Sequence, residues 1–457
     1  MSGTKMLVSF IYNINYDHLP KEAIRRAKHC LLDGLGVMLA GYRHPATQVV
    51  LDYSRNLGGN PHATVIGSGF KTSLPLTALI NGTMCHVMDF DDTNWEVRGH
   101  LTTVLLPTIL AVGEKIGASG KELLLAYILG FETACKIGKA INPSHYERGY
   151  HSTSTIGIFG ATTAAGKLLG LSSLELAYAY GIAGSRSAGL RANFGTMTKS
   201  LHAGLAAHDS ITAVLLAKLG YTSNSQILET EWGFGQVMSP EANFETPFQN
   251  LGNPLDIISS GVVVKQYPSC ARTHTALDAA LGLIHENHID PSEIVRIKCG
   301  TDAGCFKILI HPRPQNGLEA KFSMQYCLAR ACIDGQLDID HFTDEKVRDP
   351  QVQTLMERVT HYIEPDIVQK GYQFRAAAKV TMELKSGRIL EKTIHKAKGN
   401  PENPLSYKEL VQKFRGCAKD IIDDDHIEKV IHFIDEMETI SDIREVIRLL
   451  ISNQKEL

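Results

Sequence analysis

The sequence predicts a mainly α-helical fold, in which a smaller α+β domain is inserted into a large all-helical domain. Up to about residue 219, apolar residues recur almost everywhere with the three- and four-residue spacing of a helix face. Strand-like alternation is confined to residues 268–398, and helical spacing returns after them. We therefore expect a helical domain formed by residues 1–267 and 399–457, and an α+β lid domain over residues 268–398.

Size and composition narrow the class of protein. The 457 residues are enough for a large core and at least two domains. The formal net charge of −3 favours neither a nucleic acid nor an anionic membrane as a partner. No apolar run approaches the roughly 20 residues of a membrane-spanning helix, and no signal-peptide pattern begins the chain. The nine cysteines lack zinc-binding spacing, so we expect free thiols and a cytoplasmic protein.

The first predicted helices have clear start and stop signals. Residues 20–40 form one, with Pro20 in its first turn, and a Gly-Gly-Asn-Pro run ends the next, residues 45–57. Residues 63–66 form a short extended piece. A Ser-x-x-Glu capping box then opens a helix over residues 119–139.

Glycine and alanine dominate the next predicted helix, residues 157–169. Each interior glycine costs a helix about 1 kcal/mol relative to alanine, so such a helix is retained where another backbone must approach closely. We expect it at the centre of a helical bundle. A second capping box opens a helix over residues 172–184, and residues 199–219 complete this helical run.

The pattern changes after residue 265. Alternation predicts a strand at residues 294–299 and a hairpin whose strands begin near residues 380 and 389. The helices predicted in the second half of the chain are residues 275–286, 318–333, 410–417, 425–437 and 443–451.

The stretch that follows the apolar helix of residues 76–88 concentrates titratable side chains. Carboxylates stand at the C-terminal end of this helix, where the helix dipole disfavours negative charge. A second apolar run begins at Leu101, so the charged groups are held between two buried helices. Carboxylates held in such an electrostatically unfavourable position are typical of a functional site rather than a solvated loop. The residues are Asp89, Asp91, Asp92, Glu96, Arg98 and His100.

Three further motifs superficially resemble sites for other chemistries, but none of them is a specific match. Residues 67–72 lack the glycine and lysine spacing of a phosphate-binding loop. Residues 185–189 differ from a hydrolase nucleophile elbow in having serine for the first glycine and helical flanks. His86 and Asp89 have a spacing compatible with a divalent metal, but this spacing is weakly specific.

Other titratable clusters lie at predicted helix ends. One runs from Tyr146 to His151, one pairs Lys199 with His202, and one begins at Lys265. A lysine in the first turn of a helix faces the positive end of the dipole, which disfavours its ammonium form. Burial acts in the same direction, and both would be needed for Lys199 to act as a base.

Five strings together resemble the MmgE/PrpD family, in the right order and over nearly the whole chain. They are His86-Val-Met-Asp-Phe-Asp-Asp-Thr93, Tyr146-Glu-Arg-Gly-Tyr-His151, Gly195-Thr-Met-Thr-Lys-Ser-Leu-His202, Lys265-Gln-Tyr-Pro268 and Gly317-Leu-Glu-Ala-Lys-Phe-Ser323. That family includes 2-methylcitrate dehydratase, cis-aconitate decarboxylase and iminodisuccinate epimerase. The resemblance implies a helical domain built from both chain ends, an inserted α+β domain and a homodimer. It also implies chemistry without metal or organic cofactor, in the cleft between the domains.

The resemblance also implies site residues. The expected catalytic residues are Lys199, Tyr146, His151, Asp91 and His100, and the expected substrate-binding residues are Thr93, His202, Lys265, Arg98 and Cys270. Within the first group, Tyr146 and Lys199 match the two-base pair of the epimerase. Cys270 stands where the decarboxylases have a histidine, and Leu101 and Thr102 stand where the dehydratases have Pro-Ser.

The shared chemistry of such enzymes is proton transfer at a carbon beside a carboxylate, which needs a base, an acid and positive charge. We expect a cofactor-independent lyase, a dehydratase of a small hydroxy di- or tricarboxylate such as a 2-methylcitrate-like acid. Three alternatives stay open. They are an epimerase of an iminodisuccinate-like amino dicarboxylate, a cis-aconitate-type decarboxylase, and a non-catalytic carboxylate-binding protein.

Overall fold

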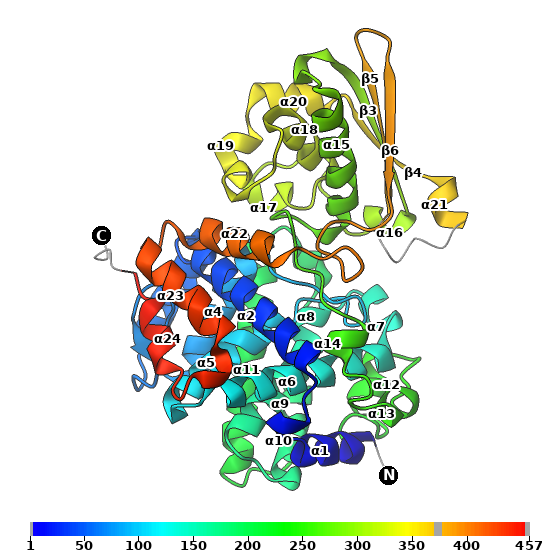
Figure 1. The fold of residues 1–457 in the computed structure, drawn as a ribbon. Helices are drawn as coiled ribbons and strands as arrows, with labels where there is room; N and C mark the ends of the chain where they lie inside the picture. The colour runs from blue at the N-terminus through cyan, green and yellow to red at the C-terminus, as the bar shows by residue number, and fades with distance from the viewer. Residues whose placement is uncertain (1–2, 370–376, 453–457) are drawn as a thin grey trace.

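The computed structural model describes residues 3–369 and 377–452, and it confirms the predicted mainly α-helical fold. Figure 1 shows a large helical part that contains both ends of the chain and a smaller part with a sheet above it. Two separate hydrophobic cores underlie these parts. The division at residues 268 and 398 stays a prediction.

The helices of the larger part follow the predicted pattern closely. Both predicted capping boxes are formed, by Ser119 with Glu122 and by Ser172 with Glu175. The helices are α1 (Gly3–Asn13), α2 (Lys21–Gly41), α3 (Pro45–Leu57), α4 (Leu74–Val87), α5 (Thr102–Ile116), α6 (Gly120–Ile141), α7 (Ser144–Glu147), α8 (Ser152–Thr155), α9 (Gly157–Leu168), α10 (Ser173–Arg186), α11 (Met197–Lys218), α12 (Phe234–Met238), α13 (Glu245–Gln249), α14 (Asp256–Ser259), α22 (Tyr407–Ala418), α23 (Asp424–Asp435) and α24 (Arg444–Leu449). A two-stranded sheet, β1 (Ala63–Thr64) with β2 (Lys71–Thr72), lies before α4.

The C-terminal helices complete the core of the N-terminal ones. In Figure 1 the orange and red helices α22 and α23 lie against the blue helix α2, and α24 packs on α23. Phe414 of α22 packs on Gly36 of α2, where an added Cβ would meet the Phe414 ring at 3.0 Å. Leu31, Leu35 and Phe414 belong to the same buried cluster. The larger part is therefore one packed unit made from both chain ends.

The glycine-rich helix α9 lies inside the bundle, as predicted. Its residues from Gly157 to Gly166 are all buried. An added Cβ on Gly160 would lie 2.6 Å from the carbonyl oxygen of Gly130 in α6. The two backbones approach so closely because neither residue has a side chain.

The smaller part is an α+β layer. Its four-stranded sheet has the order β4-β3-β5-β6, with β3 parallel to β4 and antiparallel to β5. Helices α15 and α18 pack on one face of the sheet. The elements are α15 (His274–Asn287), β3 (Ile294–Thr301), α16 (Ala303–Phe306), α17 (Gly317–Ala320), α18 (Met324–Asp334), α19 (Asp344–Val347), α20 (Pro350–Met356), β4 (Val359–Ile363), α21 (Pro365–Gln369), β5 (Ala378–Leu384) and β6 (Ile389–Ile394).

Several details differ from the sequence prediction, among them the helix α1 (Gly3–Asn13), which was not predicted. The helix expected over residues 318–333 is two helices, α17 and α18, because Ser323 caps the second by accepting a hydrogen bond from the backbone N–H of Tyr326. Strand β4 was not predicted.

Among the described residues, no helix combines the length and hydropathy that a membrane span requires.

Candidate active site

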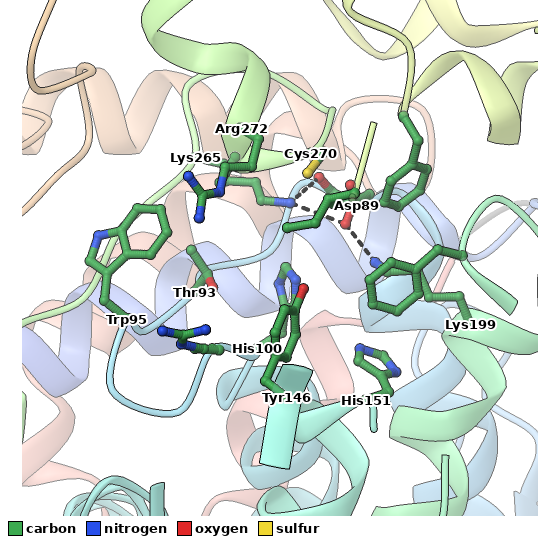
Figure 2. Close-up of a pocket in the computed structure, with 15 residues that line it drawn as sticks. Asp89, Thr93, Trp95, His100, Tyr146, His151, Lys199, Lys265, Cys270 and Arg272 are labelled. Atoms are coloured by element: carbon green, nitrogen blue, oxygen red, sulfur yellow. Dashed lines mark hydrogen bonds and ion pairs between the residues drawn. The ribbon is translucent and has the colours of Figure 1, made fainter. Parts of the chain in front are cut away.

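One cavity lies where the two parts of the chain meet, with a volume of about 130 Å³. Sites for drug-sized ligands measure ~300–1,000 Å³, so this cavity suits a small molecule. Its walls come from five regions (Figure 2). They are the connection between α4 and α5, the segment from α7 to α8, the chain around the start of α11, the chain entering the smaller part, and the loops that follow α16 and α17 within the smaller part. The lining residues are Asp89, Thr93, Trp95, Arg98, His100, Tyr146, His151, Phe194, Lys199, Lys265, Cys270, Ala271, Arg272, Ile308 and Phe322.

The connection between α4 and α5 contains two residues with unusual backbone angles. Asp89 has φ of +49° and Arg98 has φ of +55°. Residues other than glycine rarely adopt this left-handed conformation, and such strain gathers at functional sites. Both residues line the cavity, so the strained backbone presents their side chains to it.

Asp89 forms the electrostatic centre of the cavity. Its Oδ1 lies 2.7 Å from Nζ of Lys199 and 3.1 Å from Nζ of Lys265 (Figure 2). Burial alone would raise the pKa of the Asp89 carboxyl, but the two ammonium groups outweigh it and hold this pKa well below its usual range. The other oxygen, Oδ2, is buried and has no hydrogen-bond partner among the described residues.

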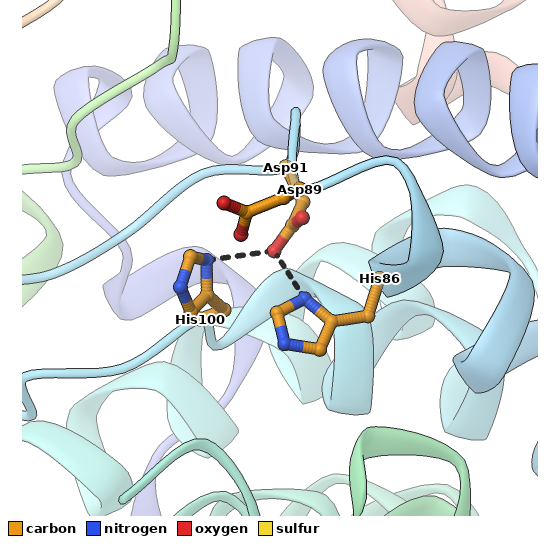
Figure 3. Close-up of side chains that lie close together, drawn as sticks. All are labelled: His86, Asp89, Asp91 and His100. Carbon is orange, nitrogen blue, oxygen red and sulfur yellow. Dashed lines mark hydrogen bonds and ion pairs between the residues drawn. The ribbon is translucent and has the colours of Figure 1, made fainter. Parts of the chain in front are cut away.

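Asp91 lies behind the cavity wall and orients two histidines, of which His100 lines the cavity. Its Oδ2 lies 3.0 Å from Nδ1 of His86 and 2.7 Å from Nδ1 of His100 (Figure 3). Burial would raise the pKa of Asp91, and the two imidazole groups hold it well below its usual range instead. Burial lowers the pKa of His86 to about 3 and that of His100 in the same direction, so both rings are neutral near pH 7. Nδ1 of His100 also forms a hydrogen bond with the carbonyl oxygen of Asp92 at 2.8 Å. Because this nitrogen is engaged by Asp91 and Asp92, the Nε2 atom is left for the cavity.

The same four side chains form a possible metal-ligand group. One ligand atom each from His86, Asp89, Asp91 and His100 lie within 4.8 Å of one another. However, Asp89 already has two ammonium groups within 3.1 Å, and Asp91 accepts from both imidazoles. A divalent cation at this point would be repelled by Lys199 and Lys265, so the charges fit an anionic ligand better.

His151 has a second histidine as its support. Its Nδ1 lies 3.0 Å from Nδ1 of His202, and both rings are buried. The Nε2 atom of His151 is buried and without a hydrogen-bond partner among the described residues. Burial and the nearby His86 and Lys199 hold the pKa of His151 well below its ordinary value. The ring is therefore a neutral imidazole with one free nitrogen at the cavity.

Tyr146 and Arg98 line another side of the cavity, and Arg191, which is not a lining residue, packs on the Tyr146 ring. The guanidinium of Arg191 lies 4.0 Å from the centre of the Tyr146 ring, and that of Arg98 lies 5.8 Å away. Burial raises the pKa of Tyr146, so the phenol keeps its proton. Arg272 is paired with Asp302 at 3.0 Å and faces the Trp95 ring at 5.9 Å.

Most of the predicted site residues meet in this one cavity. Lys199, Tyr146, His151, His100, Thr93, Lys265, Arg98 and Cys270 all line it. The other two do not: Asp91 lies behind His100, and His202 lies behind His151. The hydroxyl of Thr93 donates to the carbonyl of Gly99 at 3.0 Å, which ties the connection to itself.

Several lining residues were not predicted. Asp89 was predicted as part of the functional acidic stretch and as a possible metal ligand, but it was not among the individual catalytic or substrate-binding residues. Trp95 and Arg272 flank predicted residues, but the sequence holds no signal that they turn inwards. Phe194, Ile308 and Phe322 are apolar and give no signal of function.

Comparison with known proteins gives matches over most of the chain. The model of the MmgE/PrpD N-terminal domain matches residues 5–247, and that of the MmgE/PrpD C-terminal domain matches residues 267–438. Cis-aconitate decarboxylase of Homo sapiens is 30% identical, over 98% of this chain and 94% of its own length. The decarboxylase of Mus musculus is 29% identical, over 98% and 93%. 2-Methylcitrate dehydratase of Escherichia coli K12 is 25% identical, over 84% and 83%.

Proposed function

The chain belongs to the MmgE/PrpD family, and from this premise we propose that it is a hydro-lyase acting on a small hydroxy di- or tricarboxylate. One observation carries the proposal. A neutral imidazole with a free nitrogen, His151, shares a small cavity with the ammonium groups of Lys199 and Lys265. A base and fixed positive charge beside each other are what removal of a proton next to a carboxylate requires.

In this proposal His151 is the base. When its Nδ1–H donates to His202, its Nε2 carries the lone pair that faces the cavity. Nε2 takes the proton from the carbon next to the carboxylate, and the carbon–carbon double bond forms as the carbon–oxygen bond breaks. Tyr146 supplies the proton with which the hydroxyl leaves as water, and it recovers a proton from the imidazolium through solvent.

The lysines bind the substrate carboxylate in this scheme. The sequence suggested Lys199 as the base, but its ion pair with Asp89 at 2.7 Å favours a fixed cation instead. Together with Lys265 it stabilises the negative charge that spreads onto the carboxylate when the proton leaves. Nε2 of His100, oriented by Asp91, can accept a hydrogen bond from a substrate hydroxyl.

Decarboxylation is the second candidate, because the relatives named cis-aconitate decarboxylase match 98% of the chain at 29% and 30% identity. In that reaction a carbon–carbon bond breaks, carbon dioxide leaves, and the remaining carbanion takes a proton. His151, which is neutral in the resting site, would first take up a proton from solvent and then donate it to the carbanion, so the same side chain serves either reaction.

Incubation of the enzyme with citrate-like and aspartate-derived acids in deuterium oxide tests the proposal. A hydro-lyase gives an alkene without carbon dioxide, and deuterium enters the substrate only through the reverse reaction. A decarboxylase releases carbon dioxide and leaves one deuterium on the product carbon. An epimerase gives a product of inverted configuration that contains deuterium. Failure of every acid to react would favour the non-catalytic carboxylate-binding protein.

Two further expectations belong to the same proposal. We expect a homodimer, which sedimentation at several protein concentrations would test. We also expect a cytoplasmic location, which fractionation of the source cells would test.

A further inference from the structure

The turn after α4 receives hydrogen bonds from three lysines, two of them buried and one half-buried, at three successive carbonyl groups. Lys321 donates to the carbonyl of Met88 at 2.7 Å, Lys265 to that of Asp89 at 2.7 Å, and Lys413 to that of Phe90 at 2.8 Å. These carbonyls immediately follow the last residue of α4, Val87. One ammonium group therefore serves each residue of the turn.

The local backbone explains why donors are needed there. The last carbonyls of a helix lack partners within it, and the helix dipole gives this end a negative charge. Three carboxylates follow at once, and Asp89 has the strained φ of +49°. The N–H groups of the lysines satisfy the carbonyls, and each lysine that is protonated also offsets both sources of negative charge.

Two of these lysines lie outside the walls of the active-site cavity. Lys321 comes from the smaller part, and it also donates to the carbonyl of Pro268 at 2.9 Å. Lys413 comes from α22, lies 3.9 Å from the centre of the Phe90 ring, and forms an ion pair with Asp33 of α2 at 2.6 Å. Both ammonium groups thus reach the turn from behind, while Asp89 faces the cavity.

We infer that Lys321 and Lys413, the latter supported by Asp33, are positioning residues that fix Asp89 and through it the ammonium groups of Lys199 and Lys265. The expected effect of these lysines on turnover rests on the proposed function of the cavity, whereas their effect on the geometry of the turn is independent of that function. Because Lys321 comes from the smaller part and Lys413 from α22, the active-site carboxylate takes its position only when both segments are in place.

Apolar replacements of matched length test the inference. Lys321→Met removes one donor, and the double variant Asp33→Asn with Lys413→Met removes the other without leaving a lone buried charge. Lys413→Arg is a second variant that retains the charge. Lys136→Met is the matched control, because Lys136 is also buried between carboxylates and donates to a backbone carbonyl, that of Asn250, at 2.8 Å. Lys136 does not line the cavity.

Crystal structures of the variants give the first readout, which is independent of the reaction. We expect Asp89 to leave the left-handed conformation, or its carboxylate to separate from Lys199, in Lys321→Met and in the Asp33→Asn/Lys413→Met double variant, and not in the Lys136→Met control. A turn that is unchanged in both variants would overturn the inference, whatever the enzyme catalyses.

Steady-state kinetics with the acid that the wild-type enzyme converts give the second readout. A displacement of about 1 Å in an active site costs up to about 100-fold in rate, so we expect kcat to fall about 10-fold to 100-fold while KM changes less. Lys413→Arg should retain most of the rate, and Lys136→Met nearly all of it. Equal losses of kcat in the control and in the two variants would show a general effect on folding and contradict a positioning role.

Discussion

His151 depends on the side chain behind it. The contact of its Nδ1 with His202 leaves Nε2 as the only ring nitrogen that faces the cavity. Burial and the neighbouring cation keep the ring neutral. A base can accept a proton only in its unprotonated form. Because its pKa is lowered, His151 stays unprotonated below pH 6.5, the usual pKa of histidine.

We predict that His151→Gln lowers kcat/KM at least about 100-fold, since general-base catalysis contributes ~10²–10⁴-fold. Steady-state assays and thermal unfolding should be run beside His145→Gln. His145 is equally buried, and its Nε2 forms a hydrogen bond with the Thr155 hydroxyl at 2.7 Å. It does not line the cavity.

The control should lose stability without a comparable loss of turnover. In the wild type, the acid limb of kcat/KM should lie below pH 6.5, because the pKa of His151 is lowered. A variant that turns over at nearly the wild-type rate would exclude His151 as the base.

We predict that extensive dialysis against a chelator leaves turnover unchanged. The two acids among the four possible ligands already face ammonium or imidazole groups at 2.7–3.1 Å. Activity should be measured before and after dialysis, with the metal content determined in parallel. Loss of activity that one divalent ion restores would make His86, Asp91 and His100 metal ligands.

The sequence predicted the acidic run as a site but could not choose among its carboxylates. Asp89 and Asp91 are two residues apart, and their directions depend on the left-handed turn at Asp89. That turn is held by lysines from distant segments, among them Lys321 and Lys413. No local pattern contains this information, so the sequence favoured Asp91 where the structure places Asp89 on the cavity wall.

At the scale of elements, the helices with apolar faces and capping boxes were predictable, because their signals are local. The break between α17 and α18 was not, since the cap at Ser323 interrupts an apolar pattern that continues across it. Strand β4 pairs in parallel with β3 from far along the chain. Its residues alternate weakly in burial, so no local periodicity marks them.

We predict that Gly160→Ala destabilises the protein by about 1–3 kcal/mol, the usual cost of overpacking a core. The new Cβ would lie 2.6 Å from the carbonyl oxygen of Gly130, and neither backbone can move without disturbing α6 or α9. Chemical denaturation would measure the change in the free energy of unfolding.

Gly416→Ala is the matched control for this prediction. Gly416 is an exposed glycine within α22, and an added Cβ there meets nothing within 4 Å. Its replacement should stabilise the helix by about 0.5–1 kcal/mol. Stabilisation of both variants would contradict the close packing of α6 against α9 at Gly160.

At the scale of the whole molecule, Lys321 links the two parts through Met88 and Pro268. Burial lowers the pKa of Lys321 to about 7, although Asp89 acts in the opposite direction and Lys265, Lys199 and Cys327 also face it. Above this pH the native amine is neutral but still has two N–H groups for the two carbonyls. The unfolded chain keeps the proton up to about pH 10.4.

We therefore predict that this lysine makes the protein more stable as the pH rises from about 7 to 10. In that range the unfolded state binds more protons than the native state, so one such group adds up to about 1.4 kcal/mol per pH unit. Thermal unfolding of the wild type and of Lys321→Met should give a difference in Tm that grows with pH in favour of the wild type. A constant difference would contradict the lowered pKa.

The discontinuous helical core also sets an order of events during synthesis. A ribosome releases α2 roughly 370 residues before α22, the helix that covers it. At ~5–20 residues per second this interval is about 20–70 s. During that time the α2 surface around Gly36 lacks its Phe414 partner, while the whole of the smaller part has already been made. The nascent chain must therefore keep an apolar helix face from aggregating until α22 emerges, and a chaperone that binds apolar segments would protect this surface in the interval.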